Sequence, residues 1–456
     1  MPLQKNQVLT LRVERLSSDG SGVAHSPDGE TVFIPGAAPG DEARVRIVKD
    51  CKRYAFGILD EVLTPSPDRI PVDCAVAGPC GGCSLRHLDY AAELRAKQEN
   101  VADAFARIGG LDVPVLPIVG SPEVNRYRNK VQFPVGVDKS GKPCIGFYAG
   151  RTHRIVPCPD CRLQPGVLNE IGNALCAFFA EKGIQPYSEE TGRGLVRHIF
   201  LRRGAHSGQI MVCLVCTCAK LPCAEELCIR LKAQFAEITT ILLNVNAKNT
   251  NVILGTETHT LYGQGYIEDT LCGVPVQLGP LSFYQVNTLA AEQLYGIAAQ
   301  YAQLTPDDLL LDLYCGMGTI GLSMAAHCRE LIGVEIVPEA IESAKANAAR
   351  MGADVAAKSR FFCADAGQAA TRLAAEGLHP DIVMLDPPRK GCDEATLSAV
   401  VRMAPRRVVY VSCNPATAAR DAAWLEQNGY HAEKVQPVDL FPRTRHCECV
   451  LSLSKV

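Results

Sequence analysis

The sequence predicts an α/β protein with several domains: a small β-barrel, a central α+β part and a doubly wound parallel sheet. Three observations predict this arrangement. Short apolar runs separated by Gly, Pro and Asp fill residues 1–62, a Pro-rich stretch then marks a boundary, and strands alternate with Ala-rich helical segments from about residue 280. We therefore expect domains at 1–62, 63–278 and 279–456, because 456 residues are too many for one core.

The barrel is expected from four strand-like runs bounded by turn residues, at 7–16, 29–36, 40–50 and 54–63. A small five-stranded barrel of this kind often presents its loops to RNA. Basic residues also gather here, although a solvated surface face would show the same pattern. The five that fall within ten positions are Arg44, Arg46, Lys49, Lys52 and Arg53.

The central part is expected to mix helices and strands. Residues 89–110 are helical in pattern and end on a glycine pair, and strands are expected at 125–136, 195–204 and 209–217. On a strand, the alternating basic residues of the first of these would share one face. They are Arg126, Arg128 and Lys130.

The C-terminal part carries five near-continuous apolar runs, as expected of parallel strands buried on both faces. They lie at 309–315, 330–337, 359–366, 381–388 and 406–413. The tail adds two more strand-like segments, 434–441 and 446–455, which we expect to form an antiparallel hairpin at the edge of the sheet.

Composition restricts where the protein works and what it binds. No run of 18 apolar residues occurs and the N-terminus has no signal-peptide pattern, so we expect a cytoplasmic protein without a membrane span. A net charge of −3 means that a nucleic acid would have to be bound through local patches. Most of the 21 cysteines, including Cys213, Cys216 and Cys218, lie in apolar runs and are expected to be small buried hydrophobes.

The first βα turn of the C-terminal sheet is glycine-rich, with the spacing Gly316-x-Gly318-x-x-Gly321. Such a turn brings backbone close to a ligand at a helix N-terminus. The next strand ends in Glu335, whose carboxylate can accept hydrogen bonds from two ribose hydroxyls, and Asp365 ends the third strand. Dehydrogenases share this glycine pattern, so alone it does not separate nicotinamide cofactors from S-adenosylmethionine.

Two side chains are candidates for catalysis. Cys413 ends the fifth strand and leads into Asn414-Pro415, a turn that would present its thiol to a cleft as a covalent nucleophile. Glu448 lies among apolar and cysteine residues, where desolvation would raise its pKa into the range of a general base. The alternatives are a buried structural cysteine and an acid on the surface of an edge strand.

A cluster of cysteines, Cys74-x5-Cys80-x-x-Cys83, follows the Pro-rich boundary. A fourth thiol would come from Cys158 or Cys161. Four thiolates suit a structural zinc ion or a [4Fe–4S] cluster, and the spacing does not separate them.

These segments together resemble the RNA (uracil-5-)-methyltransferase family, and most closely its 23S ribosomal RNA branch. The resemblance extends over nearly the whole chain. It is carried by the N-terminal barrel, which resembles a TRAM domain, and by CAVAGPCGGC, YRNK, FYQVN, DLYCGMGTIGL, GVEIVPEAIESAKANA, LDPPRKG, SCNPATAARD and HCECVLSL.

The resemblance implies a class I methyltransferase that methylates carbon 5 of uracil, with Cys413 as nucleophile and Glu448 as proton acceptor. It implies RNA as partner, no obligate protein partner, and a [4Fe–4S] cluster on Cys74, Cys80, Cys83 and Cys161. The residues that it places around S-adenosylmethionine are Gln285, Tyr314, Thr319, Glu335, Asp365 and Asp386.

Three other functions stay open at this point. Transfer RNA could replace ribosomal RNA as the substrate, although family members acting on it commonly lack both the barrel and the cysteine cluster. An adenine amino-methyltransferase would use Asp386-Pro387-Pro388 and need no cysteine. A non-catalytic iron–sulfur RNA-binding protein would need neither the glycine loop nor Cys413.

Overall fold

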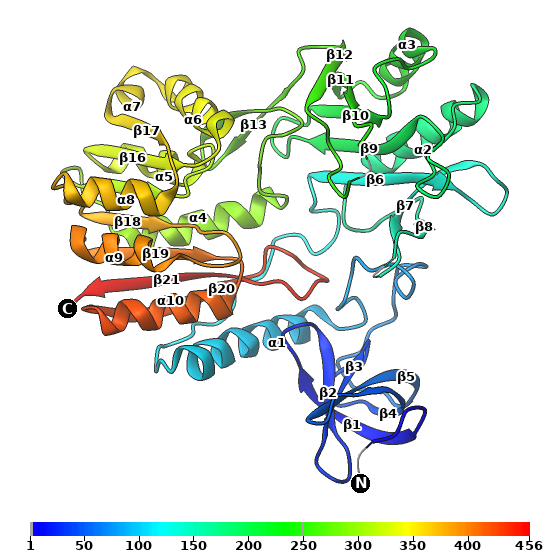
Figure 1. The fold of residues 1–456 in the computed structure, drawn as a ribbon, viewed down its shortest axis with the longest axis horizontal. Helices are drawn as coiled ribbons and strands as arrows, with labels where there is room; N and C mark the ends of the chain where they lie inside the picture. The colour runs from blue at the N-terminus through cyan, green and yellow to red at the C-terminus, as the bar shows by residue number, and fades with distance from the viewer. Residues whose placement is uncertain (1–2, 151, 249) are drawn as a thin grey trace.

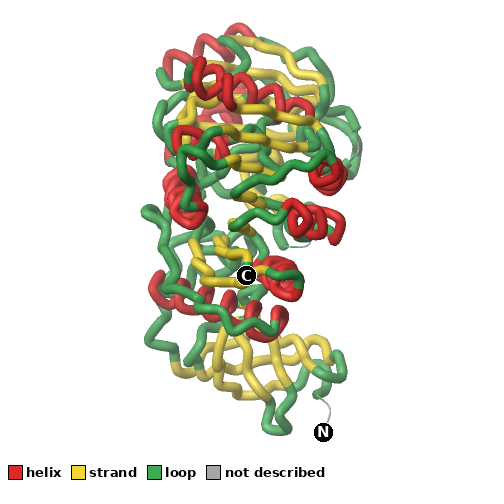
Figure 2. Tube along the Cα trace, turned by 90° about the vertical axis from the view of Figure 1, so that its left-hand side faces the viewer, coloured by secondary structure: helices red, strands yellow, loops and turns green. Residues whose placement is uncertain are grey.

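A computed structural model of the chain describes residues 3–150, 152–248 and 250–456. A small barrel lies at one end, a sheet with helices on both faces forms the largest part, and a second sheet stands beside it (Figures 1 and 2). The described residues contain no helix with the length and apolar character that crossing a membrane requires.

The N-terminal barrel is closed by five strands in the order β1-β2-β3-β5-β4. Alternate side chains such as Val32, Ile34, Val45 and Ile47 fill its interior and are fully buried. The expected barrel is thus present, and its second strand, which the sequence patterns did not reveal, is the short Gly- and Ser-containing run β2. The strands are β1 (Val8–Leu16), β2 (Ser21–His25), β3 (Thr31–Pro35), β4 (Glu42–Asp50) and β5 (Tyr54–Thr64).

Helix α1 (Tyr90–Asp103) links the barrel to the C-terminal sheet. Asp89 caps it by accepting a hydrogen bond from the Ala91 amide at 3.1 Å, and a single π-helical turn, η1 (Ala104–Gly109), extends it. Val101 and Phe105 belong to the same buried apolar cluster as side chains on one face of the C-terminal sheet. The helix therefore packs against the C-terminal sheet.

The central sheet has seven strands in the order β12-β11-β10-β9-β6-β7-β8, and helices α2 (Gly166–Glu181) and α3 (Ala224–Gln234) pack against it. A hairpin, β13 (Ile267–Leu271) with β14 (Val274–Leu278), follows. The sheet strands are β6 (Lys130–Val137), β7 (Pro143–Tyr148), β8 (Ile155–Pro157), β9 (Val196–Arg203), β10 (Ile210–Cys216), β11 (Ile238–Val245) and β12 (Glu257–Tyr262).

Two expectations for this region were wrong. The first strand begins at Lys130, so Arg126 and Arg128 precede it and do not share a strand face with it. Arg126 has a left-handed φ of 61° and its guanidinium donates to the Cys161 carbonyl at 2.7 Å, which holds the segment in a loop. Cys213 and Cys216 are buried as expected, but Cys218 lies beyond the strand end and is exposed.

The C-terminal sheet has the order β17-β16-β15-β18-β19-β21-β20, with five parallel strands and an antiparallel hairpin at one edge, as expected. Successive side chains enter different cores: Leu310 packs toward α4 and α5, and Leu311 packs toward α8, α9 and α10. The strands are β15 (Leu309–Leu313), β16 (Glu330–Glu335), β17 (Ser359–Cys363), β18 (Ile382–Leu385), β19 (Arg407–Ser412), β20 (Tyr430–Val438) and β21 (Glu448–Lys455). The helices are α4 (Thr288–Ala302), α5 (Thr319–Met324), α6 (Pro338–Met351), α7 (Ala353–Lys358), α8 (Ala366–Ala375), α9 (Glu394–Met403) and α10 (Pro415–Gln427).

Candidate active site

The glycine-rich turn joins β15 to α5 at the carboxyl edge of the C-terminal sheet. Asp312 accepts a hydrogen bond from the Gly321 amide at 3.0 Å, and a Cβ on Gly321 would stand 2.7 Å from the same carboxylate. Gly316 has a φ of 55°, and a Cβ built on it meets no protein atom within 4 Å. The loop thus leaves an open space beside the backbone of Gly316, where a ligand can approach closely.

Glu335 closes this space from the neighbouring strand. Its Oε2 accepts a hydrogen bond from the Gly316 amide at 3.2 Å, and its Oε1 accepts from the amides of Ile336 at 2.8 Å and Val337 at 3.0 Å. Asp365 follows the next strand and caps α8 by accepting from the Gln368 amide at 3.1 Å. Both carboxylates are therefore held at fixed positions on one edge of the sheet.

Gln285, Thr319 and Tyr295 meet on the other side of the glycine loop. The Tyr295 hydroxyl is hydrogen-bonded to the side chains of Gln285 and Thr319, and burial raises its pKa. The backbone of Gln285 is held in place by Asn129, whose Nδ2 donates a hydrogen bond to the Gln285 carbonyl at 2.7 Å. Tyr314, on the loop, instead lies with its hydroxyl 3.4 Å from Thr396 Oγ1.

Cys413 and Glu448 are brought together by the antiparallel strand. Ser412 at the end of β19 is the register partner of Cys449, so the first residue of β21 comes to the carboxyl edge of the parallel strands. Glu448 and Asp386 both raise the pKa of the Cys413 thiol, and Asp386 also raises that of Glu448, so the three side chains lie close together. The sequence indicated Cys413 and Glu448 as two separate candidates. The pairing register of β21 with β19 brings them close together.

Burial controls the protonation of these groups. Desolvation and, to a smaller extent, the charge of Asp386 raise the pKa of Glu448 to about 8, and desolvation raises the pKa of Asp386 to about 7. Desolvation also raises the pKa of the Cys413 thiol, as do the neighbouring Glu448 and Asp386. Glu448 is only 5% exposed, so it is not a surface acid.

Arg389 is the basic side chain of this group, and sequence patterns assigned it no role. It is hydrogen-bonded to the Cys413 thiol and lowers the pKa of both Cys413 and Glu448. Its carbonyl accepts from Asn414 Nδ2 at 2.9 Å, and the Asn414 Oδ1 caps α10 by accepting from the Ala416 amide at 3.2 Å. The position of Arg389 directly after Asp386-Pro387-Pro388 was the available signal.

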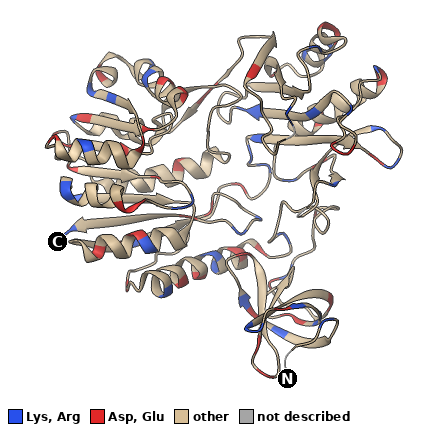
Figure 3. Cartoon of the chain, in the orientation of Figure 1, with Lys and Arg blue, Asp and Glu red and all other residues tan. Residues whose placement is uncertain are grey.

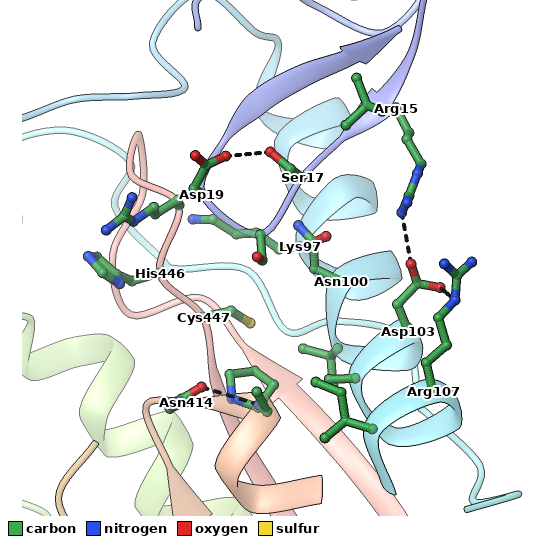
Figure 4. Close-up of a pocket in the computed structure, with 18 of the residues that line it drawn as sticks. Arg15, Ser17, Asp19, Lys97, Asn100, Asp103, Arg107, Asn414, His446 and Cys447 are labelled. Atoms are coloured by element: carbon green, nitrogen blue, oxygen red, sulfur yellow. Dashed lines mark hydrogen bonds and ion pairs between the residues drawn. The ribbon is translucent and has the colours of Figure 1, made fainter. Parts of the chain in front are cut away.

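Cys413 lines a cavity of about 620 Å³, here called the interdomain pocket. Figure 4 shows this pocket with Asn414 and Cys447 on one side and Lys97 and Asn100 of α1 on another. One wall is the barrel, a second is α1 with η1, and the third comprises the turn after β19 and the turn before β21. A group bound here contacts both the barrel and Cys413. Lining residues include Arg15, Ser17, Asp19, Thr31, Phe33, Lys97, Asn100, Arg389, Cys413, Asn414, Arg445, His446 and Cys447.

Five cysteines line a second cavity of about 250 Å³, here called the cysteine pocket. They are Cys74, Cys80, Cys83, Cys158 and Cys161. Arg86 is hydrogen-bonded to Cys83, and its Nε and Nη2 atoms are buried without a partner. In the described parts of the chain, no group of three or more His, Cys, Asp or Glu side chains is found that could hold a metal ion.

Comparisons with known sequences agree with this architecture. A profile of the tRNA (uracil-5-)-methyltransferase family matches residues 276–456, and a TRAM-domain profile matches residues 2–59. The chain is 43% identical over 453 residues to an uncharacterized RNA methyltransferase of Halalkalibacterium halodurans, covering 99% of this chain and 98% of that protein. It is 41% identical over 455 residues to one of Oceanobacillus iheyensis, covering 99% and 98%.

A solved structure shares the fold over the whole length. The tRNA (uracil-54, C5)-methyltransferase of Pyrococcus abyssi, in complex with S-adenosyl-L-homocysteine, superposes with a TM-score of 0.77 at 26% identity. The match covers 98% of this chain and 100% of that one. The chain therefore belongs to the RNA (uracil-5-)-methyltransferase family: it is an S-adenosylmethionine-dependent RNA methyltransferase with a TRAM domain at its N-terminus.

Proposed function

We propose that the enzyme methylates carbon 5 of a uracil in 23S ribosomal RNA through a covalent adduct with Cys413. The observation that carries the proposal is the meeting of Cys413, Glu448 and Asp386 at one edge of the sheet. Uracil carbon 5 is too weak a nucleophile to accept a methyl group unaided. Its methylation needs a thiolate and a base on the same cleft, and this edge offers both.

Cys413 acts first. Its thiolate adds to carbon 6, and the electron pair of the 5,6 double bond moves into an enolate, which makes carbon 5 nucleophilic. Arg389, hydrogen-bonded to the thiol, favours the thiolate form. The target base has to leave its stack to reach the thiol, and the interdomain pocket gives it room.

Glu448 acts after methyl transfer. Its carboxylate takes the proton from carbon 5, the double bond re-forms, and the Cys413 thiolate leaves carbon 6. A pKa of about 8 suits this role, because the carboxylate is then a far stronger base than a solvated glutamate. We assign contacts with both the cofactor and the uracil to Asp386, which lies beside Glu448.

S-adenosylmethionine supplies the methyl group when it is bound. The open space beside Gly316 and the amide-held carboxylate of Glu335 fit it: backbone can contact the cofactor, and Glu335 retains lone pairs for ribose hydroxyls. We assign the remaining contacts to one set of side chains at the same edge of the sheet. These are Gln285, Tyr314, Thr319, Asp365 and Asp386.

Five thiols line the cysteine pocket, enough for the four thiolates that either a [4Fe–4S] cluster or a structural zinc ion takes. We propose the cluster, because the resemblance of the surrounding sequence to the family implies it. Unpartnered Arg86 nitrogens favour an anionic occupant. We propose Cys74, Cys80, Cys83 and Cys161 as ligands, in a structural role.

Iron and acid-labile sulfide analysis of anaerobically purified protein tests the cluster. We expect four iron and four sulfide ions per chain in the wild type and the loss of both in Cys80→Ser. Cys144→Ser is the control and should retain both, because Cys144 is half-buried but lies outside the pocket. Stoichiometric zinc in place of iron would overturn the assignment.

The three domains divide this work. We propose that residues 1–62 grip RNA, that 63–278 carry the cluster, and that 279–456 catalyse the reaction. The thiols and the RNA substrate both suit a cytoplasmic enzyme.

Transfer RNA is the second candidate substrate. The Pyrococcus abyssi enzyme that matches nearly the whole chain acts on tRNA uracil-54, and its full-length match means that the barrel does not separate the two substrates. The adenine alternative has no use for a thiol beside a buried glutamate.

Methyl transfer from labelled S-adenosylmethionine to unmodified 23S and transfer RNA tests the proposal, with the product nucleoside identified. 5-Methyluridine in 23S RNA supports it. 5-Methyluridine in transfer RNA alone would overturn the substrate, and methylated adenine would overturn the mechanism.

A further inference from the structure

Three aromatic rings form a continuous group on the outside of the barrel. Phe33 on β3 and Phe56 on β5 are register partners, and their ring centroids are 5.8 Å apart. The Tyr54 ring lies 5.7 Å from Phe33 and 5.6 Å from Phe56, edge-on to both. The intervening Val32 and Ala55 are fully buried in the barrel, so the three rings face outward.

This group, here called the aromatic platform (Phe33, Tyr54 and Phe56), adjoins the catalytic cleft. Phe33 and its strand neighbour Thr31 line the interdomain pocket that also contains Cys413. Tyr54 is 40% exposed and extends the aromatic surface away from the pocket. A chain that leaves Cys413 through the pocket therefore reaches the platform on the barrel.

Free positive charge lies beside the platform. Arg44 and Arg46 are paired with Glu61 at 2.6 Å and Asp60 at 2.7 Å. Over the part of the chain that the structure describes, by contrast, three other basic residues make no ion pair. They are Lys49, which is the register partner of Phe56, and Lys52 and Arg53, which immediately precede Tyr54.

The local character of this charge matters because basic and acidic residues are interleaved over the molecule (Figure 3). With a net charge of −3, the protein cannot attract RNA by its overall charge. An aromatic surface flanked by unpaired cations is the combination that binds single-stranded nucleic acid: bases stack on the rings, and phosphates meet the cations.

We propose that the aromatic platform stacks one or two unpaired nucleotides that flank the target uracil, with Lys49, Lys52 and Arg53 contacting their phosphates. This inference rests on the proposed function and extends it, because it names the part of the RNA that the barrel holds. The RNA strand runs from Cys413 through the interdomain pocket to the barrel. The enzyme therefore selects a uracil within a single-stranded segment.

Variants of the platform test this through the kinetics of methylation. Phe33→Leu with Tyr54→Ser should raise KM for RNA and its Kd roughly 5- to 150-fold, the loss of about 1–3 kcal/mol expected per stacked base, with kcat unchanged. Ile58→Ser is the matched control, because Ile58 is an exposed apolar residue on the same strand as Tyr54 and lies outside the pocket. Unchanged KM and Kd in the double variant would overturn the proposal.

A cross-linking experiment tests the same proposal with the wild-type enzyme, so its result does not depend on whether a variant folds correctly. Wild-type enzyme is irradiated with RNA that carries 5-iodouridine at positions next to the target, and the cross-linked peptides are identified by mass spectrometry. We expect peptides containing Phe33, Tyr54 or Phe56. Cross-links confined to the central domain, or to another protein surface, would contradict the inference. Absence of 5-methyluridine with wild-type enzyme would instead refute the proposed function.

Discussion

Lys97 Nζ lies 2.8 Å from Asp439 Oδ1, and this ion pair joins helix α1 to the turn after β20. Both side chains are buried, as is Glu93, whose Oε1 is 2.7 Å from the same ammonium group. The Glu93 Oε1 also accepts from the Arg443 amide at 2.7 Å. One cation thus holds two carboxylates, and together they fix the segment that leads to Glu448.

Lys97→Met should lower the free energy of unfolding by about 3–5 kcal/mol, because it removes the ammonium group shared by two buried carboxylates. Glu93 keeps only the more distant Arg443 guanidinium, at 3.7 Å. Urea unfolding followed by circular dichroism measures the change. Lys345→Met is the control: Lys345 pairs with Glu342 on the surface at 2.8 Å, and its loss should change stability by less than about 0.5 kcal/mol. Equal effects of the two substitutions would contradict this account of the buried group.

The rate should rise with pH between about 6.5 and 8.5. Desolvation raises the pKa of Glu448 to about 8 and raises that of the Cys413 thiol, and both groups act in their deprotonated forms. At pH 7 only about one tenth of the Glu448 side chains are ionised at this pKa. Measurement of kcat/KM over this range checks the prediction, and a flat or falling profile would contradict it.

The same burial should make Glu448 destabilising at high pH. The ordinary pKa of a glutamate is 4.5 and that of Glu448 in the fold is about 8, so between these pH values the folded state holds a proton that the unfolded state has lost. Stability therefore falls as pH rises through this window. Glu448→Gln should be more stable than wild type at pH 8, by on the order of a few kcal/mol, and nearly equal to it at pH 4.5. Thermal unfolding at both pH values measures the difference, and a variant less stable at pH 8 would refute the sign.

Gly316→Ala should weaken S-adenosylmethionine binding at least tenfold, because the new Cβ projects into the open space assigned to the cofactor. Gly377→Ala is the control, since Gly377 also has a left-handed φ, of 81°, and open space around it, but lies between α8 and β18. Both should lose about 1–2 kcal/mol of stability from the backbone strain. Isothermal titration with the cofactor separates them, and equal affinities would contradict the assignment of the loop.

The C-terminal sheet was predictable because each parallel strand is buried on both faces and leaves a continuous apolar run, as in Leu309–Leu313. The barrel was predictable as a class, but β2 was not seen. Its five residues, Ser21–His25, carry a glycine and small side chains and resemble the turns around them. The barrel can close only if β2 pairs with both β1 and β3. This strand is therefore defined by its pairing in the fold and not by its own sequence pattern.

The loop at Arg126 shows the limit of periodicity. Alternating basic residues indicated a strand, but Arg126 bonds to the carbonyl of Cys161, 35 positions along the chain, and the backbone turns there. Lys97 and Arg389 were not identified for the same reason. Lys97 lies in an ordinary helical pattern, and its partner Asp439 is 342 positions away. Candidate catalytic residues were readable from strand ends, whereas the residues that hold them depend on tertiary contacts.

The covalent mechanism is tested most directly by incubating the Glu448→Gln enzyme with unmodified RNA and S-adenosylmethionine and looking for a complex that survives denaturation. In this variant Cys413 can still add to carbon 6 and uracil carbon 5 can still take the methyl group, but the base that removes the carbon 5 proton is missing. We predict a stable protein–RNA adduct that contains the methyl label and maps to Cys413, and its absence when Cys413→Ala is added. A Glu448→Gln enzyme that forms no adduct, or a Cys413→Ala enzyme that still makes 5-methyluridine, would contradict the central claim.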